Sequence, residues 1–279
     1  MLKLKLKYLG TAAAEGWPAL FCTCESCKRA ATAGGRNIRT RSQAVIDDKL
    51  LIDFPADTFM HVLYGGLDLT KISNCIITHS HGDHLYPADF EMRKKPFAYL
   101  ETQCALTVYG TESTGKKLQE TLNLQQLSQE GIVLFEYITP FEEFNVDEYV
   151  ITPLKADHDP RTNPVIYIIS DAKKTILYGN DTGYFPQETW DYLEKHKPHF
   201  DFVSLDCTVG FGKCRNNHMD FDTNLEVKER FIEIGCADKA TIFCVNHFSH
   251  NGKVIYDEMV PIAQKAGFLV SYDTMEIEI

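Results

Sequence analysis

Residues 77–90 hold the densest group of chemically reactive side chains in the sequence. They read ITHSHGDHLYPADF and follow the pattern H-x-H-x-D-H, at His79, His81, Asp83 and His84. With ten histidines in 279 residues, three fall at this spacing in roughly one shuffled chain in a hundred. A turn whose polar side chains are satisfied locally is the alternative. Imidazole and carboxylate groups so close together favour a divalent metal site.

A second group of reactive side chains is the cysteine cluster in FCTCESC, at residues 21–27. Cys22, Cys24 and Cys27 make a poor disulfide framework, because a C-x-C pair is too tight to close and three thiols leave one over. As a structural zinc site the cluster is one ligand short of a tetrahedron. Either the three thiols are free in a loop, or a fourth Cys or His comes from elsewhere in the chain.

Four further polar residues stand where an apolar run gives way to a loop, so we expect each at the end of a strand. They are Asp53 in LLIDF, His158 in LKADHD, Asp181 in YGNDTG and His247 in VNHFSH. Each one alone is an ordinary polar residue at a strand end. Together with the H-x-H-x-D-H segment, they provide the additional ligands that two metal ions would need.

The elements that must position these residues are mostly short strands. Apolar, β-branched runs predict strands at 2–8, 42–46, 50–53, 75–78, 105–109, 149–154, 165–170, 175–178, 202–206, 241–246 and 269–272. Helices are expected at 186–196 and at 223–234, where T-N-L-E opens the second helix as a capping box at Thr223. Strands alternating with helices indicate sheets covered by helices, an α/β architecture.

The strand expected at 75–78 explains how the histidine segment converges. A buried strand ending there delivers His79 and His81 together at its end. Gly82 frees the backbone for a turn, after which Asp83 and His84 are expected to begin a helix and face the same point.

Composition limits the class of protein. The chain is 44% hydrophobic and 24% charged, with no apolar run long enough to span a bilayer, so no membrane association is expected. The start, MLKLKLKYLG, alternates like a half-buried strand and lacks the continuous apolar block of a signal peptide. Nine cysteines, an odd number, favour a reducing cytoplasm. No repeat or linker divides the sequence, which predicts one domain over 1–279 with the cysteine loop inserted near 20–30.

The net charge of −11 argues against a partner such as extended nucleic acid, which a basic surface would bind. A small anionic substrate is compatible with the composition, because metal ions can supply local positive charge. A homodimer is also compatible with the sequence.

Taken together, these residues resemble the metallo-β-lactamase superfamily over essentially the whole chain. The resemblance implies an αββα sandwich with the site along one edge of its two sheets. It implies His79, His81 and His158 on one metal ion, Asp83, His84 and His247 on a second, Asp181 bridging both, and Asp53 bonded to a ligand imidazole. An aspartate at the bridging position is typical of the phosphodiester and thioester hydrolases of the superfamily.

One subgroup matches further. G-T-A-A-A-E-G-W-P with C-x-C-x2-C, then R-N-N-H-M-D-F-D-T (215–223), N-H-F-S-H (246–250) and the terminal Y-D-T-M-E-I look like the phosphoribosyl cyclic phosphate phosphodiesterases of the carbon-phosphorus lyase pathway. That resemblance implies that His250 completes a Cys3His structural zinc site with Cys22, Cys24 and Cys27. It also implies that His218, otherwise an ordinary surface histidine, acts as a general acid.

The ligand set predicts the chemistry. Two divalent ions, manganese or zinc, that share one water lower its pKa toward about 7, so hydroxide is available at neutral pH to attack phosphorus. The favoured function is therefore cleavage of a phosphodiester, and the resemblance to the subgroup implies a small one, above all a cyclic phosphate such as phosphoribosyl 1,2-cyclic phosphate. Two alternatives stay open: a tRNA 3′-processing nuclease, and a non-catalytic zinc-binding helper of the kind found in pyrroloquinoline quinone biosynthesis.

Overall fold

A computed structural model describes residues 4–101 and 104–279, and its centre is a pair of seven-stranded sheets. The first sheet has the strand order β14-β1-β2-β3-β4-β5-β6. In chain order its strands are β1 (Lys5–Gly10), β2 (Gln43–Ile46), β3 (Leu50–Ile52), β4 (Asn74–Ile76), β5 (Leu106–Gly110), β6 (Val133–Tyr137) and β14 (Glu276–Glu278). The last strand of the chain thus forms one edge of this sheet, antiparallel to β1, with Lys5 opposite Glu278 and Lys7 opposite Glu276.

The second sheet has the order β13-β12-β11-β10-β9-β8-β7. Its strands are β7 (Phe144–Val146), β8 (Tyr149–Lys155), β9 (Val165–Ser170), β10 (Thr175–Gly179), β11 (Phe202–Asp206), β12 (Ile242–Asn246) and β13 (Phe268–Val270). Apart from β14, the N-terminal half of the chain builds the first sheet and the C-terminal half builds the second.

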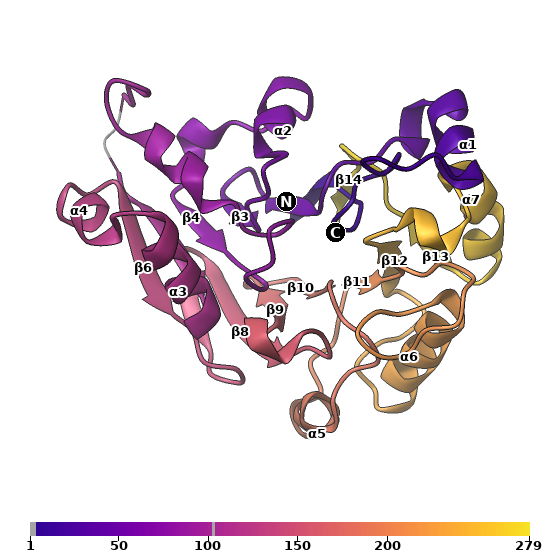
Figure 1. Cartoon of the computed structure of the whole chain (residues 1–279). Coiled ribbons are helices and arrows are strands. Elements are labelled where there is room, and N and C mark those ends of the chain that lie inside the picture. Colours follow the sequence, from indigo (N-terminus) through magenta and orange to yellow (C-terminus); the bar gives the residue numbers. More distant parts are fainter. Residues whose placement is uncertain (1–3, 102–103) are drawn as a thin grey trace.

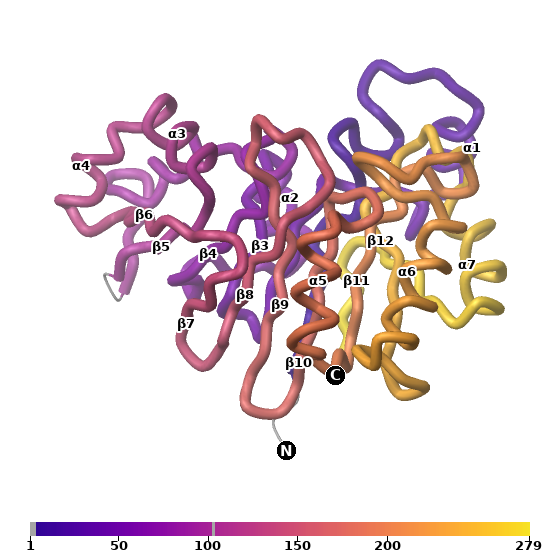
Figure 2. The backbone as a smooth tube through the Cα atoms, turned by 90° about the horizontal axis from the view of Figure 1, so that it is seen from below, coloured from indigo at the N-terminus to yellow at the C-terminus, as the bar shows by residue number. Residues whose placement is uncertain are grey.

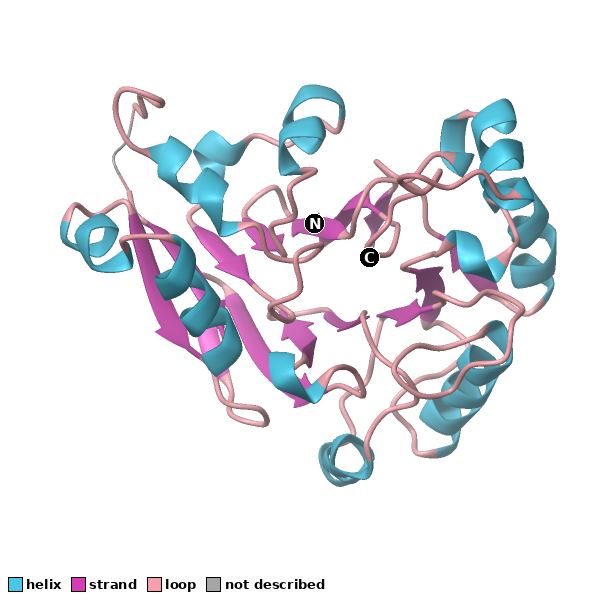
Figure 3. Cartoon of the chain, in the orientation of Figure 1, coloured by secondary structure: helices cyan, strands magenta, loops and turns pink. Residues whose placement is uncertain are grey.

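Helices cover the outer face of each sheet, which gives four layers (Figures 1 and 3). The α-helices are α1 (Glu25–Ala33), α2 (Thr58–Tyr64), α3 (Glu112–Thr121), α4 (Leu124–Gln129), α5 (Gln187–His196), α6 (Phe221–Glu233) and α7 (Tyr256–Lys265). Helices α2, α3 and α4 lie with the first sheet, while α5, α6 and α7 lie with the second. Helix α1, from the start of the chain, sits beside α7 at its end, as Figure 1 shows. The predicted αββα sandwich is confirmed.

Three apolar cores correspond to the three interfaces between these layers. The central core joins the inner faces of both sheets, with Leu6 and Ile52 from the first and Ile169 from the second. Its buried tyrosines satisfy their hydroxyl groups across the interface: Tyr8 donates to Ser204 Oγ at 2.7 Å and Tyr167 donates to the Ile77 carbonyl at 2.6 Å. Burial of large side chains with satisfied polar tips fixes the sheets against one another.

Strand direction explains why one edge of the sandwich collects the functional side chains. Strand β3 is parallel to β4, and β10, β11 and β12 are parallel to one another. Strand β8 runs the same way as β10, because each is antiparallel to β9 between them. The carboxyl ends of these strands therefore meet at a common edge, where the loops that follow can converge. The tube view in Figure 2 shows β8 to β12 side by side.

The structure corrects several local predictions. Strands β6, β7 and β14 were not predicted from the sequence. Helix α6 begins at Phe221 and its N-cap is Asp220, whose carboxylate accepts from the Thr223 N–H at 2.7 Å, so the capping box at Thr223 was wrong. Asp83 and His84 lie in a hydrogen-bonded turn and do not begin a helix. The predicted strand at 2–8 is found from Lys5, and residues 2 and 3 lie outside the described part of the chain.

Among residues 4–101 and 104–279, no helix combines the length and apolar character that crossing a bilayer requires.

Candidate functional site

Five strand ends bring the candidate residues to the common edge. Asp53 follows β3, the histidine segment follows β4, His158 follows β8, Asp181 follows β10 and His247 follows β12. Asp53 and His247 have left-handed backbone conformations, with φ of 66° and 61°. Such conformations are costly for residues with a side chain, and they occur often where a side chain must be aimed at a functional site.

Three histidines form the first group of converging atoms. His79 Nε2 lies 3.0 Å from His81 Nδ1, and His158 Nε2 lies 3.1 Å from the same His81 atom. Nitrogen ligands at about 2.0–2.1 Å in a tetrahedron around zinc would be about 3.3 Å apart. The spacing is therefore close to that of three ligands on one ion.

Asp83, His84 and His247 form the second group. His84 Nε2 lies 3.3 Å from His247 Nε2 and 3.3 Å from Asp83 Oδ2. Asp181 connects the two groups, because its Oδ2 atom lies within 3.4–3.9 Å of an Nε2 atom from members of both. Those members are His79, His84, His158 and His247.

The outer nitrogen of each imidazole has a hydrogen-bond partner that fixes which nitrogen carries the proton. His84 Nδ1 donates to Asp53 Oδ2 at 2.7 Å, and His158 Nδ1 donates to the Asn217 carbonyl at 3.0 Å. The outer nitrogens of His79, His81 and His247 lie beside an oxygen of Thr78, Asp159 and Thr208, respectively. When the proton is on the outer nitrogen, the inner nitrogen of each ring carries a lone pair. These inner nitrogens face one another at nitrogen–nitrogen distances of 3.0–3.3 Å. Bare lone pairs so close repel unless a cation lies between them, so this donor set fits metal ions.

Electrostatics favour the metal-binding protonation states at two of these residues. Burial, with the neighbouring His84 and His158, lowers the pKa of His79 well below its usual value, so its imidazole stays neutral. Burial alone would raise the pKa of Asp83, but His84 outweighs burial and lowers it, so the carboxylate stays charged. Burial would lower the pKa of His84, but Asp83 and Asp53 raise it well above its usual value, so His84 would release a proton when a metal ion binds. Neutral imidazole and ionised carboxylate are the forms that bind metal.

His218 lies on the open side of the cluster, in the loop before α6. Its Nδ1 atom is 2.7 Å from Asp181 Oδ1 and 3.2 Å from Asp206 Oδ2. Burial alone would lower the pKa of His218, but Asp206 and Asp181 raise it to about 11. A cation on Asp181 would cancel part of this negative charge and bring the pKa down. The two carboxylates therefore favour the protonated form of the His218 imidazole.

Asp206 is a site residue that the sequence reasoning missed. It is fully buried at the end of β11, contacts His218, and lies 3.5 Å from His247 Nδ1. Its Oδ1 atom also accepts the backbone N–H groups of Thr208 and Met219. The available signal was its position, because it ends an apolar strand in the same way as Asp53 and Asp181.

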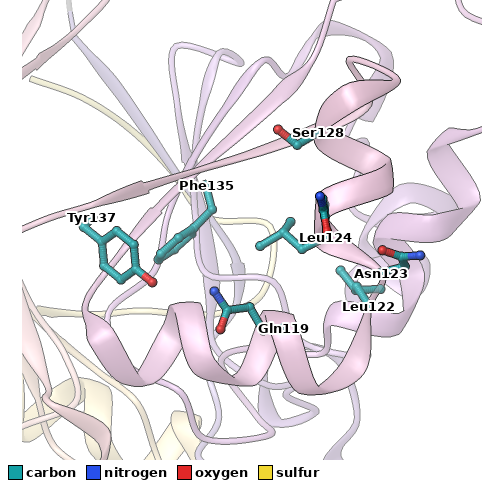
Figure 4. A pocket seen from close by; sticks show the side chains of 8 residues that line it. Gln119, Leu122, Asn123, Leu124, Ser128, Phe135 and Tyr137 are labelled. Atoms are coloured by element: carbon teal, nitrogen blue, oxygen red, sulfur yellow. The ribbon is translucent and has the colours of Figure 1, made fainter.

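A pocket of about 360 Å³ opens onto this cluster. Its lining includes Ala13, Ala14, Glu15, His81, Asp83, His158, Asp181, Thr208, Val209, His218, His247, Ser249 and Asn251. A larger hollow of about 510 Å³ lies elsewhere, between α3, α4 and β6 (Figure 4). There Gln119 of α3 lies near Phe135 and Tyr137 of β6, and the lining has only apolar, aromatic, amide and hydroxyl groups. The candidate ligands and His218 therefore line the smaller pocket.

The fold also brings His250 next to the cysteine cluster. The Sγ atoms of Cys22 and Cys24 each lie 3.4 Å from His250 Nδ1, and all four ligand atoms, including Cys27 Sγ, lie within 4.8 Å of one another. The Ala19 N–H donates to Cys27 Sγ, and the Ser26 hydroxyl donates to the His250 carbonyl at 2.9 Å. All nine cysteines are free thiols, so the cluster is not a disulfide.

Two thiols of this cluster differ in their ease of ionisation. Hydrogen bonds from the Ser26 hydroxyl and the His250 imidazole lower the pKa of Cys24 to about 5, which favours the thiolate that binds metal. Burial raises the pKa of Cys27 to about 12, so Cys27 would ionise only when a cation binds beside it.

The chain belongs to the β-lactamase superfamily, since the family model for the beta-lactamase superfamily domain matches residues 52–248. The match spans the strand ends that hold Asp53, the histidine segment, His158, Asp181 and His247. The family predicted from the sequence is confirmed. The roles of these residues as metal ligands stay predictions.

Several solved structures share the fold over nearly the whole chain. A diphosphatase from the PhnP family has a TM-score of 0.75 at 20% identity, covering 100% of this chain and 98% of that one. Zn²⁺-bound PqqB from Methylobacterium extorquens has a TM-score of 0.76 at 17% identity, covering 99% of this chain and 100% of that one. The short form of human tRNase Z has a TM-score of 0.66 at 16% identity, covering 99% of each chain. Among curated relatives, ribonuclease Z from Listeria innocua is 25% identical over 131 residues, or 46% of this chain and 42% of the relative. The chain thus spans less than half the length of the curated relatives it matches.

Proposed function

We propose that this protein is a metal-dependent hydrolase of small phosphodiesters, with a cyclic phosphate such as phosphoribosyl 1,2-cyclic phosphate as its preferred substrate. One observation carries the proposal. Two groups of converging ligand atoms share the Asp181 carboxylate, and the His218 imidazole lies 2.7 Å from the same carboxylate at the mouth of an open pocket. The motifs that resemble the phosphoribosyl cyclic phosphate phosphodiesterases support the choice of substrate, and the fold is shared with a diphosphatase from the PhnP family.

The ligand assignment follows the two groups of atoms. One cation would be held by His79, His81 and His158, a second by Asp83, His84 and His247, and both by Asp181. Two divalent ions there would supply Lewis acidity toward the phosphoryl oxygens and lower the pKa of a water molecule. Asp53 holds His84 with its proton on Nδ1, and the Asn217 carbonyl does the same for His158, so both imidazoles present Nε2 to the site.

His218 is the proposed acid for the leaving group. The bond to be broken leaves an alkoxide, which is a poor leaving group until it receives a proton or a hydrogen bond. Because its Nδ1 atom faces Asp206 and Asp181, His218 has Nε2 free to donate toward the pocket. Asp206 is thus a positioning residue that keeps the ring oriented and charged.

RNA processing is the second candidate, favoured by the curated relatives named ribonuclease Z. The charge of the chain counts against it. A protein that binds many phosphates neutralises them with lysine and arginine, whereas this chain has 28 basic against 39 acidic residues. The pocket of about 360 Å³ lies within the range usual for small-molecule sites.

For the cysteine cluster we propose a structural zinc site closed by His250. Three thiolates and one imidazole satisfy the four-ligand preference of zinc and leave no position for substrate. His250 is three residues beyond His247, so zinc would tie the loop before α1 to the segment that carries a ligand of the catalytic site.

A substrate panel tests the function. Protein loaded with manganese or zinc is assayed on phosphoribosyl 1,2-cyclic phosphate, a 2′,3′-cyclic nucleotide, bis(p-nitrophenyl) phosphate and a precursor tRNA. We expect turnover of the synthetic diester and the highest kcat/KM on the cyclic phosphate. Faster cleavage of the precursor tRNA would favour the nuclease, and no turnover with any metal would favour the non-catalytic helper.

A further inference from the structure

A further group of potential ligand atoms lies on the side of Asp181 that faces His218. Asp181, Asp206, His218 and His247 each bring one such atom, and all four atoms lie within 4.8 Å of one another. His218 Nδ1 is 2.7 Å from Asp181 Oδ1 and 3.2 Å from Asp206 Oδ2. These carboxylate oxygens are not the ones used above, because the two metal groups share Asp181 Oδ2. The group is therefore distinct in its atoms from both of them.

His247 is the one member of this group whose nitrogen is already in use. Its Nε2 atom lies 3.3 Å from His84 Nε2 in the second metal group, and its Nδ1 atom lies 2.8 Å from the Thr208 hydroxyl. When a metal ion is bound on Nε2, the proton is on Nδ1, which then has no lone pair to offer. Three donors remain, and we call them the third ligand set: Asp181 Oδ1, Asp206 Oδ2 and His218 Nδ1.

The Asp181 member of the third ligand set is a buried oxygen without a hydrogen bond. Asp181 is 3% exposed, and its Oδ1 atom accepts no hydrogen bond from the described residues, although His218 Nδ1 is so close. The hydrogen bond of His218 Nδ1 goes to Asp206 Oδ2. One proton on Nδ1 cannot satisfy both carboxylates, and an unsatisfied buried acceptor costs free energy. A metal ion can bind both oxygens and the nitrogen at once.

The Asp206 member is held in place by the backbone. Its Oδ1 atom accepts the N–H groups of Thr208 at 2.9 Å and Met219 at 3.0 Å, so Oδ2 stays beside His218. Within residues 4–101 and 104–279, the ion-pair partners of Asp181 and Asp206 are all histidines. Two buried carboxylates without a lysine or arginine favour a divalent cation.

Zinc is the cation that best fits this donor set. Zinc ligands in a tetrahedron are about 3.3 Å apart, so the His218–Asp206 contact is already near this distance and the His218–Asp181 contact would widen by about 0.6 Å. Zinc also binds such ligands more tightly than manganese does. The affinity should be lower than in the two other groups, because the set has only three ligands and two cations on Asp181 Oδ2 would repel a third.

We propose that the third ligand set is a low-affinity zinc site through which excess zinc inhibits the enzyme. Zinc would form one bond to each of the three atoms and take the place of the proton on His218 Nδ1, which goes to solvent. The inhibition rests on the function proposed above, because a neutral His218 is a poorer acid for the leaving group. The metal site itself does not depend on that function.

Equilibrium dialysis followed by elemental analysis tests the site on the metal-loaded protein. At free zinc from about 1 to 200 µM, wild type should bind one ion per chain more than Asp206→Asn or His218→Ala, with half-saturation in the micromolar range. His199→Ala is the matched control, because His199 is an exposed histidine beside Asp238, and it should bind as much zinc as wild type. Equal zinc in all four proteins at the highest concentration overturns the site.

Anomalous diffraction at the zinc edge gives a second measurement that does not depend on the folding of a variant. Wild-type crystals soaked in excess zinc should show a peak about 2.0–2.2 Å from the three atoms of the third ligand set. The peak should disappear first when the crystals are returned to buffer without zinc. Soaked crystals with occupied metal groups but no peak at the third ligand set would contradict the proposal.

Kinetics separate the failure of this site from the failure of the proposed function. Excess zinc should slow hydrolysis of an alkyl diester at least about 10-fold and bis(p-nitrophenyl) phosphate much less, because p-nitrophenolate leaves without a proton. Equal inhibition of both diesters would show that zinc does not act through His218. A third zinc ion in a protein that cleaves no diester would contradict the proposed function alone, whereas an active enzyme without that ion would contradict only the inhibitory site.

Discussion

The molecule holds two clusters of potential metal ligands that are joined by one short segment. His247 ends β12 and belongs to the histidine–aspartate cluster, and His250 follows three residues later and belongs to the cysteine cluster. The first cluster opens onto a pocket of about 360 Å³ and has the His218 imidazole at its edge. The second already has the four nitrogen and sulfur atoms of a tetrahedral site.

The two clusters differ in the chemical type of their candidate ligands. Carboxylates contribute to the first cluster and are absent from the ligand set of the second. The carboxylate of Asp181 has one oxygen toward the imidazoles and the other toward His218, so in the proposed mechanism it would connect metal binding to proton transfer. The cysteine cluster, in contrast, receives N–H donors on its sulfurs, which stabilise thiolates without providing an acid. We therefore expect changes in the two clusters to separate activity from stability.

The largest expected effect is on the first cluster. Asp83→Ala removes a carboxylate ligand and should lower kcat/KM by about 10³-fold or more, since one of the two charge-stabilising ions is lost. Thermal unfolding should still show a cooperative transition, because Asp83 lies in a turn and outside the apolar cores. Steady-state kinetics and metal analysis are the measurements. Asp89→Ala, six residues along the same segment, is the control, and wild-type activity in Asp83→Ala would remove Asp83 from the ligand set.

A smaller loss is expected at the edge of the same cluster. His218→Ala should lower turnover by about 10² to 10⁴ on a diester with an alkoxide leaving group. Bis(p-nitrophenyl) phosphate should lose much less, because p-nitrophenolate leaves without a proton. Kinetics on both substrates measure the difference, with His199→Ala as an exposed-histidine control. Equal losses on the two substrates would show that His218 does not act as the acid.

The smallest effect on activity is expected from the second cluster. Cys24→Ser should reduce bound zinc by about one ion per chain and lower the unfolding temperature, while activity falls less than in Asp83→Ala. His250→Ala should release the same ion, and Cys104→Ser, a free cysteine outside the cluster, should not. Elemental analysis after mild chelation, paired with thermal unfolding, gives both values. Zinc content that does not change in either variant would mean that the cluster holds no metal.

The strands that carry the candidate site were predicted from the sequence more accurately than the strands at the edges of the first sheet. The apolar runs before Asp53, Asp181 and His247 are buried on both sides of a sheet, so their composition alone marks them. Strand β6 is an edge strand whose burial fades along its length, and β14 has only three residues with one buried side chain. Edge strands lack the continuous apolar pattern on which sequence reasoning depends.

Within the site, motif spacing located the histidines but could not locate their supporting groups. Asp206 was missed because an aspartate at the end of a strand is common and nothing near it in sequence is unusual. Its role depends on His218 and His247, which reach it only through the fold. The predicted N-cap of α6 was wrong for a related reason. Asp220 and Thr223 are both residue types that cap helices and stand three residues apart, and the Asp220 carboxylate accepts a hydrogen bond from the Thr223 N–H.

The edge position of β14 has a consequence for synthesis of the chain. The strand that covers the edge of β1, through the Lys5–Glu278 and Lys7–Glu276 pairs, is translated about 270 residues after β1. At about 5–20 residues per second, the interval is roughly 14 to 55 s. During that time the edge of β1 offers unpaired backbone groups to any other nascent strand. The nascent chain therefore remains open to mispairing and chaperone binding until its last strand is made.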